Sequence, residues 1–219
     1  MSVSENDKRW LVVLVASDKI VAPFLRDFVP KGIGKLNVFL NDHLQSISTP
    51  CSLQTLTSSI CHPSSPARPD PYLRDLKFQN INNNEGRSRN NYDYSVNSLV
   101  DLAKLYLPGY LAKFAAFDNS MDMSAALRLL GHNNYPTQVF VSSNPFLDIK
   151  SLADDVRNTV RNPGAHYNES IWTEHFMNQC FEKLETLVEA LVLPADQEKD
   201  ALDQLHLWKT NGTVLSILI

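Results

Sequence analysis

Residues Glu169–Leu193 have the sequence ESIWTEHFMNQCFEKLETLVEALVL, and this stretch decides the fold class. Its large apolar side chains recur mostly at intervals of three or four residues, at Trp172, Phe176, Phe181, Leu184, Val188 and Leu191. That spacing gathers them on one face of a helix and leaves the charged side chains on the other. The stretch therefore predicts an amphipathic helix, which we expect to be the longest in the chain and to end at Pro194.

Helical spacing of apolar residues continues on both sides of this stretch. It predicts further helices over Asp7–Val29, Ile33–Ile47, Ser95–Tyr106, Ser120–Gly131, Leu147–Arg161 and Asp196–Trp208. Pro23 is expected to kink or divide the first of them, in which the β-branched pair Val12 and Val13 would also suit a buried strand. The fold class is therefore predicted to be all-α, a multi-helix bundle. Its core is expected to be drawn from Leu36, Leu40, Leu102, Leu127, Leu152, Val156, Phe176, Leu184 and Val188.

Two long loops are predicted between these helices. Ser48–Pro71 is rich in serine and proline, and proline is excluded from most helix interiors, so we expect a loop there. Asn82–Asn91 contains only polar and charged residues besides Gly86, and we expect it to contribute nothing to a core. A chain of 219 residues fits one domain. We predict a single helical domain over residues 1–219, with helices within residues 7–47 packing on a core at about 95–193.

The composition argues against several functional classes. A net charge of −4 leaves no surplus of cations for bulk binding to nucleic acid or an anionic membrane, so any RNA contact must be local. The apolar run Trp10–Ala16 is far shorter than the roughly 18 residues of a membrane span. No glycine-rich phosphate loop and no common zinc spacing occurs, so we expect no cofactor and no metal. Three cysteines in a chain with an ample core favour reduced thiols and a cytoplasmic location.

The segment Arg161–His166, RNPGAH, lies between two predicted helices late in the chain. An arginine, a polar residue, three variable positions and a histidine in this helical context resemble the motif of the HEPN superfamily. The resemblance extends upstream to Met121–Leu130, which looks like the leucine-rich helix that precedes the motif in animal HEPN-like domains, and downstream to Trp172. It covers roughly residues 95–193, which would then form a HEPN-like core.

The resemblance implies an RNA-binding or RNA-processing protein, and, if active, a metal-independent endoribonuclease. His166 would then be the catalytic acid and base, and Arg161 would stabilise charge on the phosphate. An imidazole exchanges protons near neutral pH, and a guanidinium presents a fixed fork of donors, so both residue types suit this chemistry. Arg157 and Asn162 are the predicted substrate-binding residues. The resemblance also implies a homodimer, since HEPN ribonucleases usually build the site between two copies.

An alternative interpretation assigns these residues no chemistry. Pro163 and Gly164 depart from the family pattern and predict that the helix stops near Arg161 and that residues 162–165 form a turn. Arg161 and His166 would then be ordinary helix-terminus residues, and Arg157 would pair with a neighbouring aspartate, Asp154 or Asp155. In this interpretation the protein is a non-catalytic helical module for dimerisation or for binding a protein partner.

A second cluster of cationic and aromatic residues lies in and after the asparagine-rich segment. Arg87 and Arg89, followed by Tyr92 and Tyr94, have the charge and the rings needed to contact single-stranded RNA. Two arginines in an asparagine-rich loop are more often simply solvated, and that is the interpretation that the sequence favours.

Overall fold

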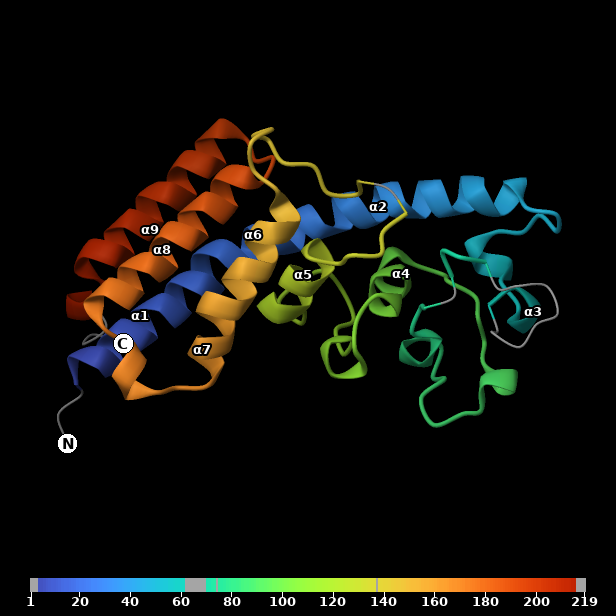
Figure 1. Ribbon diagram of the computed structural model, residues 1–219, viewed down its shortest axis with the longest axis horizontal. Helices are drawn as coiled ribbons and strands as arrows, with labels where there is room; N and C mark the ends of the chain where they lie inside the picture. Colours follow the sequence, from blue (N-terminus) through green and yellow to red (C-terminus); the bar gives the residue numbers. More distant parts are fainter. Residues whose placement is uncertain (1–3, 62–69, 74, 137, 216–219) are drawn as a thin grey trace. The chain divides into compact units, whose positions relative to one another are not determined.

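The computed structural model describes residues 4–61, 70–73, 75–136 and 138–215, and over these ranges it contains helices, turns and loops without a strand (Figure 1). This confirms the all-α fold class. The contacts divide the chain into two compact units. Unit 1 comprises Met1–Phe28, Ala126–Gly131 and Phe140–Ile219, and unit 2 comprises Val29–Ala125 and His132–Val139. The predicted core range of 95–193 contributes to both units, and the organisation as one domain over residues 1–219 stays a prediction.

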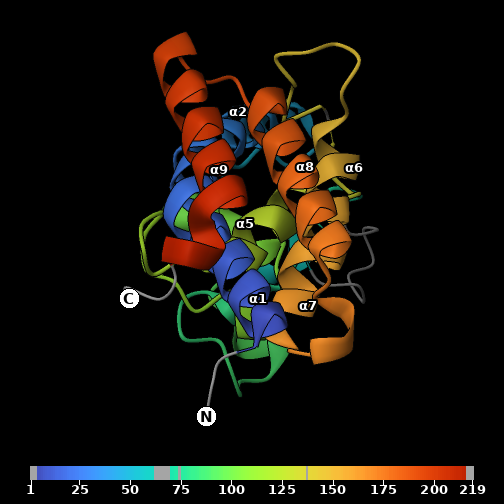
Figure 2. The same ribbon diagram turned by 90° about the vertical axis from the view of Figure 1, so that its left-hand side faces the viewer.

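Unit 1 is a layered set of helices that are distant in sequence. Helix α8 (Glu174–Ala190) contacts α6 (Ile149–Val156) on one side and α9 (Ala195–Leu215) on the other, and α1 (Glu5–Ala16) contacts both α8 and α9 (Figures 1 and 2). Helix α1 begins at a capping box in which Ser4 and Asp7 exchange hydrogen bonds. The buried side chains between the layers include Val12, Val13, Trp172, Phe181, Leu184 and Leu205.

The predicted lengths of the helices need correction. Helix α8 spans 17 residues, whereas α9 spans 21 and α2 (Ala22–Ser46) spans 25, so α8 is not the longest helix. Helix α2 joins the two helices that were predicted on either side of Pro30, because the backbone stays helical through that proline. A proline inside a helix costs about 3 kcal/mol. Val29, Gly32 and Ile33 around it are buried, and the free energy gained by this burial opposes the cost of the proline. The local sequence does not show that gain.

A π-helical turn precedes each of two prolines, Pro23 and Pro163. Ser17–Val21 precedes Ala22-Pro23, and Arg157–Arg161 precedes Asn162-Pro163. In each turn the amide of the residue before proline donates to a carbonyl five positions back, from Ala22 to Ser17 and from Asn162 to Arg157. This wider register moves the helix away from the pattern in which the proline ring would meet the carbonyl four positions back. The helical path therefore continues through both prolines.

Unit 2 is built from short helices and tight turns, apart from its share of α2. It contains α3 (Ser58–Cys61), α4 (Leu99–Leu105) and the start of α5 (Met123–Leu130). Single 3-10 turns occur at Leu53–Thr55, Phe78–Asn80, Arg89–Asn91 and Gly109–Leu111. The middle of the predicted proline-rich loop, residues 62–69, lies outside the described residues, and α3 and a 3-10 turn occupy the part before it.

The asparagine-rich segment is part of the packed structure, so the prediction that it contributes nothing to a core is wrong. The side chain of Asn84 has no exposed surface. The Asn84 amide donates to the carbonyls of Phe78 at 3.0 Å and Asp93 at 2.8 Å, and its oxygen accepts from the Asp93 amide at 3.0 Å. A buried amide is tolerated when its hydrogen bonds are satisfied, as they are here.

The predicted core residues are buried, except that Leu152 and Phe176 are only half-buried. The helices predicted over Ser95–Tyr106, Ser120–Gly131 and Asp196–Trp208 are confirmed by α4, α5 and α9. No helix in the described part of the chain has both the length and the apolarity that crossing a membrane requires.

Candidate functional site

The motif segment lies on one continuous helical path in unit 1. Helix α6 leads into the π-helical turn Arg157–Arg161 and then into α7 (Asn162–Ala165), which ends at His166. The prediction that the helix stops near Arg161 and that residues 162–165 form a turn is therefore wrong. Pro163 has no amide hydrogen for the Thr159 carbonyl, and the Cys180 thiol on α8 lies 3.7 Å from that oxygen as an alternative donor. Packing against α8 thus satisfies a backbone group that proline leaves open.

Helix α1 holds the end of this path in place. The indole nitrogen of Trp10 donates to the Gly164 carbonyl at 2.8 Å, and the Trp10 ring lies 4.9 Å from that of Tyr167. The Tyr167 hydroxyl donates to the Asp7 carboxylate. Asn6 donates from its amide to the Glu169 carbonyl at 3.0 Å. Residues 164–169 are therefore fixed at three points by one face of α1.

Gly164 lies where a side chain would press on Leu14 of α1. A Cβ atom there would lie 2.6 Å from Cδ2 of Leu14 on α1, which is closer than real side chains come. The backbone of Gly164 is helical, so it is not the turn residue that the sequence predicts, and its lack of a side chain allows α7 to approach α1 closely.

His166 is exposed between these fixed neighbours. Its backbone amide donates to the Asn162 carbonyl at 3.2 Å, and its ring makes no hydrogen bond within the described residues. Neither Gly164 nor Tyr167 can move far without breaking its contact with α1. The imidazole is therefore open to a ligand while its backbone is held in place, which is the arrangement that a proton-transfer group needs.

The predicted substrate-binding residues meet at Asn158. Its side-chain oxygen lies 3.5 Å from both the Arg157 guanidinium and the Asn162 amide. Arg157 also forms an ion pair with Asp154 at 3.4 Å, as the alternative interpretation expected. Arg157 is thus half-buried beside an acid, whereas Asn162 is exposed.

Arg161 and His166 flank α7, one at each end. On a helical path, residues five positions apart are separated by about 7.5 Å along the axis and about 140° around it. Arg161 is half-buried and His166 is exposed. The two side chains therefore start from opposite ends of α7 and differ in exposure.

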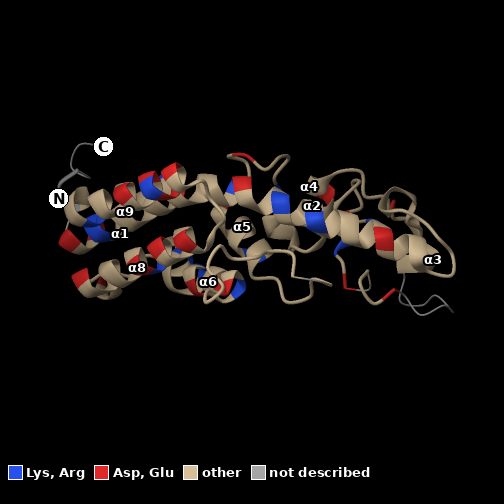
Figure 3. Cartoon of the chain, turned by 90° about the horizontal axis from the view of Figure 1, so that it is seen from above, with Lys and Arg blue, Asp and Glu red and all other residues tan. Residues whose placement is uncertain are grey.

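The neighbouring surface limits where a polyanion can approach. A cavity of about 560 Å³ lies between α6 and α8, and its charged lining consists of Asp155, Glu182 and Lys183. Lys183 already pairs with Asp155. Helix α8 carries four glutamates and one lysine, and acidic residues dominate it in Figure 3. This acidic side is therefore unfavourable for a phosphate.

Sequence reasoning missed the residues that position the site. Trp10, Asp7 and Asn6 act on a segment more than 150 positions away, so no local pattern links them to it. The indole of Trp10 was counted only as part of an apolar run, although an indole nitrogen in such a run usually requires an acceptor.

No group of three or more His, Cys, Asp or Glu side chains suited to a metal ion occurs among the described residues. The described cysteines, Cys51, Cys61 and Cys180, are all free thiols. Comparison with models of protein families, with curated protein sequences and with solved structures found no match to this chain.

Proposed function

We propose that this protein is a cytoplasmic, HEPN-like RNA-binding protein that cleaves RNA without a metal at the end of α7. The observation that carries the proposal is His166, an exposed imidazole whose two flanking segments are fixed to α1 by the Trp10 and Tyr167 contacts. The free thiols agree with a reducing compartment.

The proposed reaction is an intramolecular transesterification of the RNA backbone. His166 takes the proton from a ribose 2′-hydroxyl, whose oxygen attacks the adjacent phosphorus. The bond from phosphorus to the 5′-oxygen breaks, that oxygen takes a proton from an imidazolium, and the products are a 2′,3′-cyclic phosphate and a 5′-hydroxyl. Arg161 would neutralise charge on the phosphate oxygens, and Asn162 would orient the substrate.

The separation of Arg161 from His166 favours a homodimer as the active form. Because Arg161 precedes α7 and His166 follows it, Arg161 of one copy and His166 of a second copy can face one phosphate.

The decisive experiment is cleavage of labelled structured and unstructured RNAs in EDTA by the wild type, Arg161→Ala and His166→Ala. We expect cyclic phosphate ends from the wild type and loss of at least about 100-fold in rate for His166→Ala, the usual size of a general acid–base contribution. His175→Ala is the matched control, because His175 is exposed on α8 outside the motif. Equal inactivity of all four proteins at high concentration would remove intrinsic cleavage from the proposal.

Mixing the two inactive variants tests the shared site. If each site combines Arg161 of one copy with His166 of the other, then after subunit exchange half of the dimers have one intact site of two. About a quarter of wild-type activity should return. A site that lies within one copy would recover no activity, and that result would contradict the shared site without affecting the cleavage assay.

A second candidate function is that of a non-catalytic interaction module. It is favoured by three exposed apolar side chains of unit 1, Val141, Phe146 and Val192, of which Phe146 is 93% exposed. The segment that carries Phe146 is fixed to the end of α8, since Ser143 bonds to the carbonyls of Glu189 and Ala190. Sedimentation of Phe146→Ser beside the wild type tests it, because loss of self-association would locate the contact there.

A further inference from the structure

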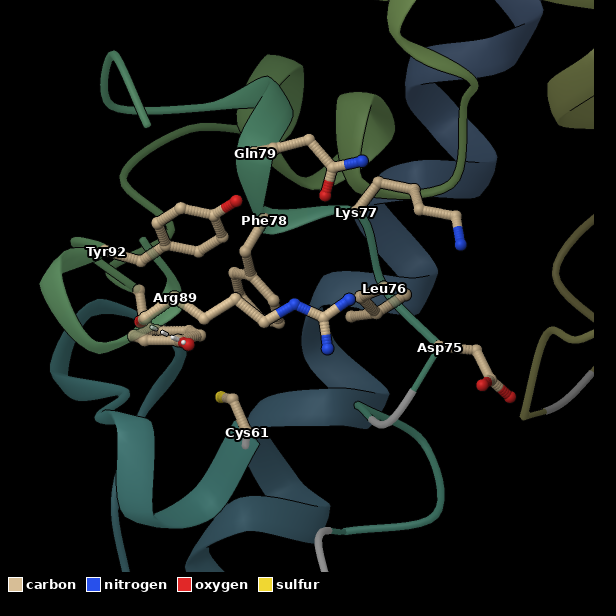
Figure 4. A pocket seen from close by; sticks show the side chains of 9 residues that line it. Cys61, Asp75, Leu76, Lys77, Phe78, Gln79, Arg89 and Tyr92 are labelled. Carbon is tan, nitrogen blue, oxygen red and sulfur yellow. Dashed lines mark hydrogen bonds between the residues drawn. The ribbon is translucent and has the colours of Figure 1, made fainter. Parts of the chain in front are cut away.

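Unit 2 contains a cavity that the proposed reaction does not use. It has a volume of about 390 Å³, within the usual range for small-molecule sites. The residues that line it are Cys61, Asp75, Leu76, Lys77, Phe78, Gln79, Arg89, Tyr92 and Tyr94. Figure 4 shows the Arg89 side chain extending across this cavity, with its guanidinium beside the Phe78 ring and Leu76. The arginine that the sequence suggested was merely solvated therefore points into a hollow.

The charge in this cavity favours an anion. Within the described residues, neither the Arg89 guanidinium nor the Lys77 ammonium has a hydrogen bond or an ion pair. Asp75 is the single acid among the described residues that line the cavity, and in Figure 4 its carboxylate points away from the guanidinium. An exposed guanidinium in this position can offer its donors in pairs to a phosphate.

Aromatic rings form the adjacent wall. Phe78 and Tyr94 are buried and pack edge to face at 4.9 Å, and the half-buried Tyr92 ring lies 5.8 Å from that of Tyr94. Tyr92 therefore rests on a fixed aromatic layer while part of its own ring remains accessible. Such a ring can stack on a nucleobase.

The backbone around the cavity is held firmly. Asn84 bonds to the Phe78 carbonyl and to both backbone groups of Asp93, and the Tyr94 hydroxyl donates to the Arg89 carbonyl at 2.9 Å. These hydrogen bonds fix the loop segments that carry Phe78, Arg89 and Tyr92. A pre-formed cavity loses less conformational entropy on binding than a mobile one.

Cys61 adds no reactive group to this cavity. Its side chain is buried, and this burial raises the pKa of the thiol to about 12, so the sulfur carries its proton at neutral pH. A protonated thiol is neither a good nucleophile nor a metal ligand, so the lining suits binding and not covalent chemistry.

We propose that this cavity binds a nucleotide, with the base stacked on Tyr92 and the phosphate held by Arg89. The nucleotide is either one unit of a single-stranded RNA or a free mononucleotide, and both present the same base and phosphate. In the first case the cavity would serve as an RNA-binding site of the same protein. The inference does not depend on cleavage at His166.

The test is calorimetric titration of the full-length protein with a 12-nucleotide single-stranded RNA and, separately, with uridine and adenosine monophosphates and inorganic phosphate. We expect Arg89→Gln to weaken binding about tenfold or more, the effect of losing hydrogen bonds to a charged group, and to lower the salt dependence by about 0.7 for a single strand. Arg87→Gln is the matched control, because Arg87 lies in the same loop but outside the lining.

The stacking contact has its own pair of variants. We expect Tyr92→Leu to weaken binding by roughly tenfold, while Tyr110→Leu changes it little, since Tyr110 is 78% exposed and does not line the cavity. Near-ultraviolet circular dichroism confirms that each variant is folded. The proposal would be overturned if none of the ligands bound to the wild type. It would also be overturned if Arg89→Gln and Arg87→Gln weakened binding equally.

The titrations distinguish a site for single-stranded RNA from a site for a free mononucleotide. An RNA site binds the 12-mer with a monophosphate as a poor competitor, whereas a mononucleotide site binds the monophosphate as well as or better than the 12-mer. Competition by inorganic phosphate as strong as that by nucleotides contradicts base stacking and overturns the proposal. The monophosphates contain no phosphodiester bond to cleave, so a failure of cleavage at His166 and a failure of this site are distinguishable.

Discussion

Two segments of the protein present a polar side chain on a firmly held backbone, but they are held in different ways. In unit 2, the loop that carries Arg89 is fixed by Asn84, whose partners lie six and nine positions away. In unit 1, the segment that carries His166 is fixed by Trp10 and Asp7, whose partners lie 154 and 160 positions away. The first depends on local loop chemistry, and the second forms only when the first helix meets the late ones.

This difference has a consequence for stability. Loss of the Asn84 side-chain amide removes one hydrogen-bond network directly. The contacts of α1 with residues 164–169 are instead supported by the packing of α1 on α8 and α9. Single changes in the loop of unit 2 should therefore cost more than single changes at the contact with α1.

The aromatic residues allow each unit to be followed separately. All three tryptophans, Trp10, Trp172 and Trp208, belong to unit 1, while every tyrosine except Tyr167 belongs to unit 2. Tryptophan fluorescence thus follows unfolding of unit 1, and the tyrosine signal in near-ultraviolet circular dichroism follows mainly unit 2.

The largest effect is expected for Asn84→Leu. It leaves the Phe78 carbonyl and both backbone groups of Asp93 without their partner. The buried bond to Phe78 then costs about 1–3 kcal/mol and each part-buried bond to Asp93 about 0.5–1.5 kcal/mol, so we expect a loss of about 2–6 kcal/mol. Urea unfolding followed by the tyrosine signal measures it. Asn90→Leu is the control, since Asn90 is exposed in the same loop. A loss below about 1 kcal/mol would mean that Asn84 does not hold the loop.

A smaller effect is expected for Gly164→Ala. The added methyl group meets Leu14, so we expect a loss of about 1–3 kcal/mol in the unfolding free energy measured by tryptophan fluorescence. In a Leu14→Ala background the clash is absent, and alanine should then stabilise the helix by about 0.5–1 kcal/mol relative to glycine. Equal losses in both backgrounds would contradict the steric role of Gly164.

The smallest effect is expected for Tyr167→Phe, and it depends on pH. The pKa of Asp7 lies below its ordinary value of 3.8, mainly because the Tyr167 hydroxyl and then Ser4 donate hydrogen bonds to the carboxylate. A lowered pKa adds stability above pH 3.8 that is lost as the pH falls through the folded-state pKa. The wild type should therefore have a slightly higher Tm than Tyr167→Phe at pH 7, and this difference should shrink in acid.

Thermal unfolding of the wild type, Tyr167→Phe and Tyr110→Phe between pH 7 and acid measures this difference. Tyr110→Phe should match the wild type at every pH, because Tyr110 is an exposed side chain of unit 2. A Tm difference for Tyr167→Phe that stayed constant with pH would assign the effect to the ring and not to Asp7.

Much of the helical architecture follows from local pattern. The apolar spacing in α4, α5, α8 and α9 predicted helices that the structure contains. The proline positions were harder, because Pro30 and Pro163 both predicted a break. Helix α2 and the path from α6 to α7 continue instead, one through burial and the other through a π-helical turn and the Cys180 thiol.

The candidate sites, too, were predicted from the sequence only in part. The sequence alone singled out Arg161 and His166, and it also offered Arg89 and Tyr92 as residues for RNA. Only the tertiary structure decided that His166 stands exposed beside a segment fixed to α1, and that Arg89 points into an aromatic cavity. The physical reason is range, since spacing along the chain sets which side chains share a helix face, while hydrogen bonds from distant residues set which of them remain accessible.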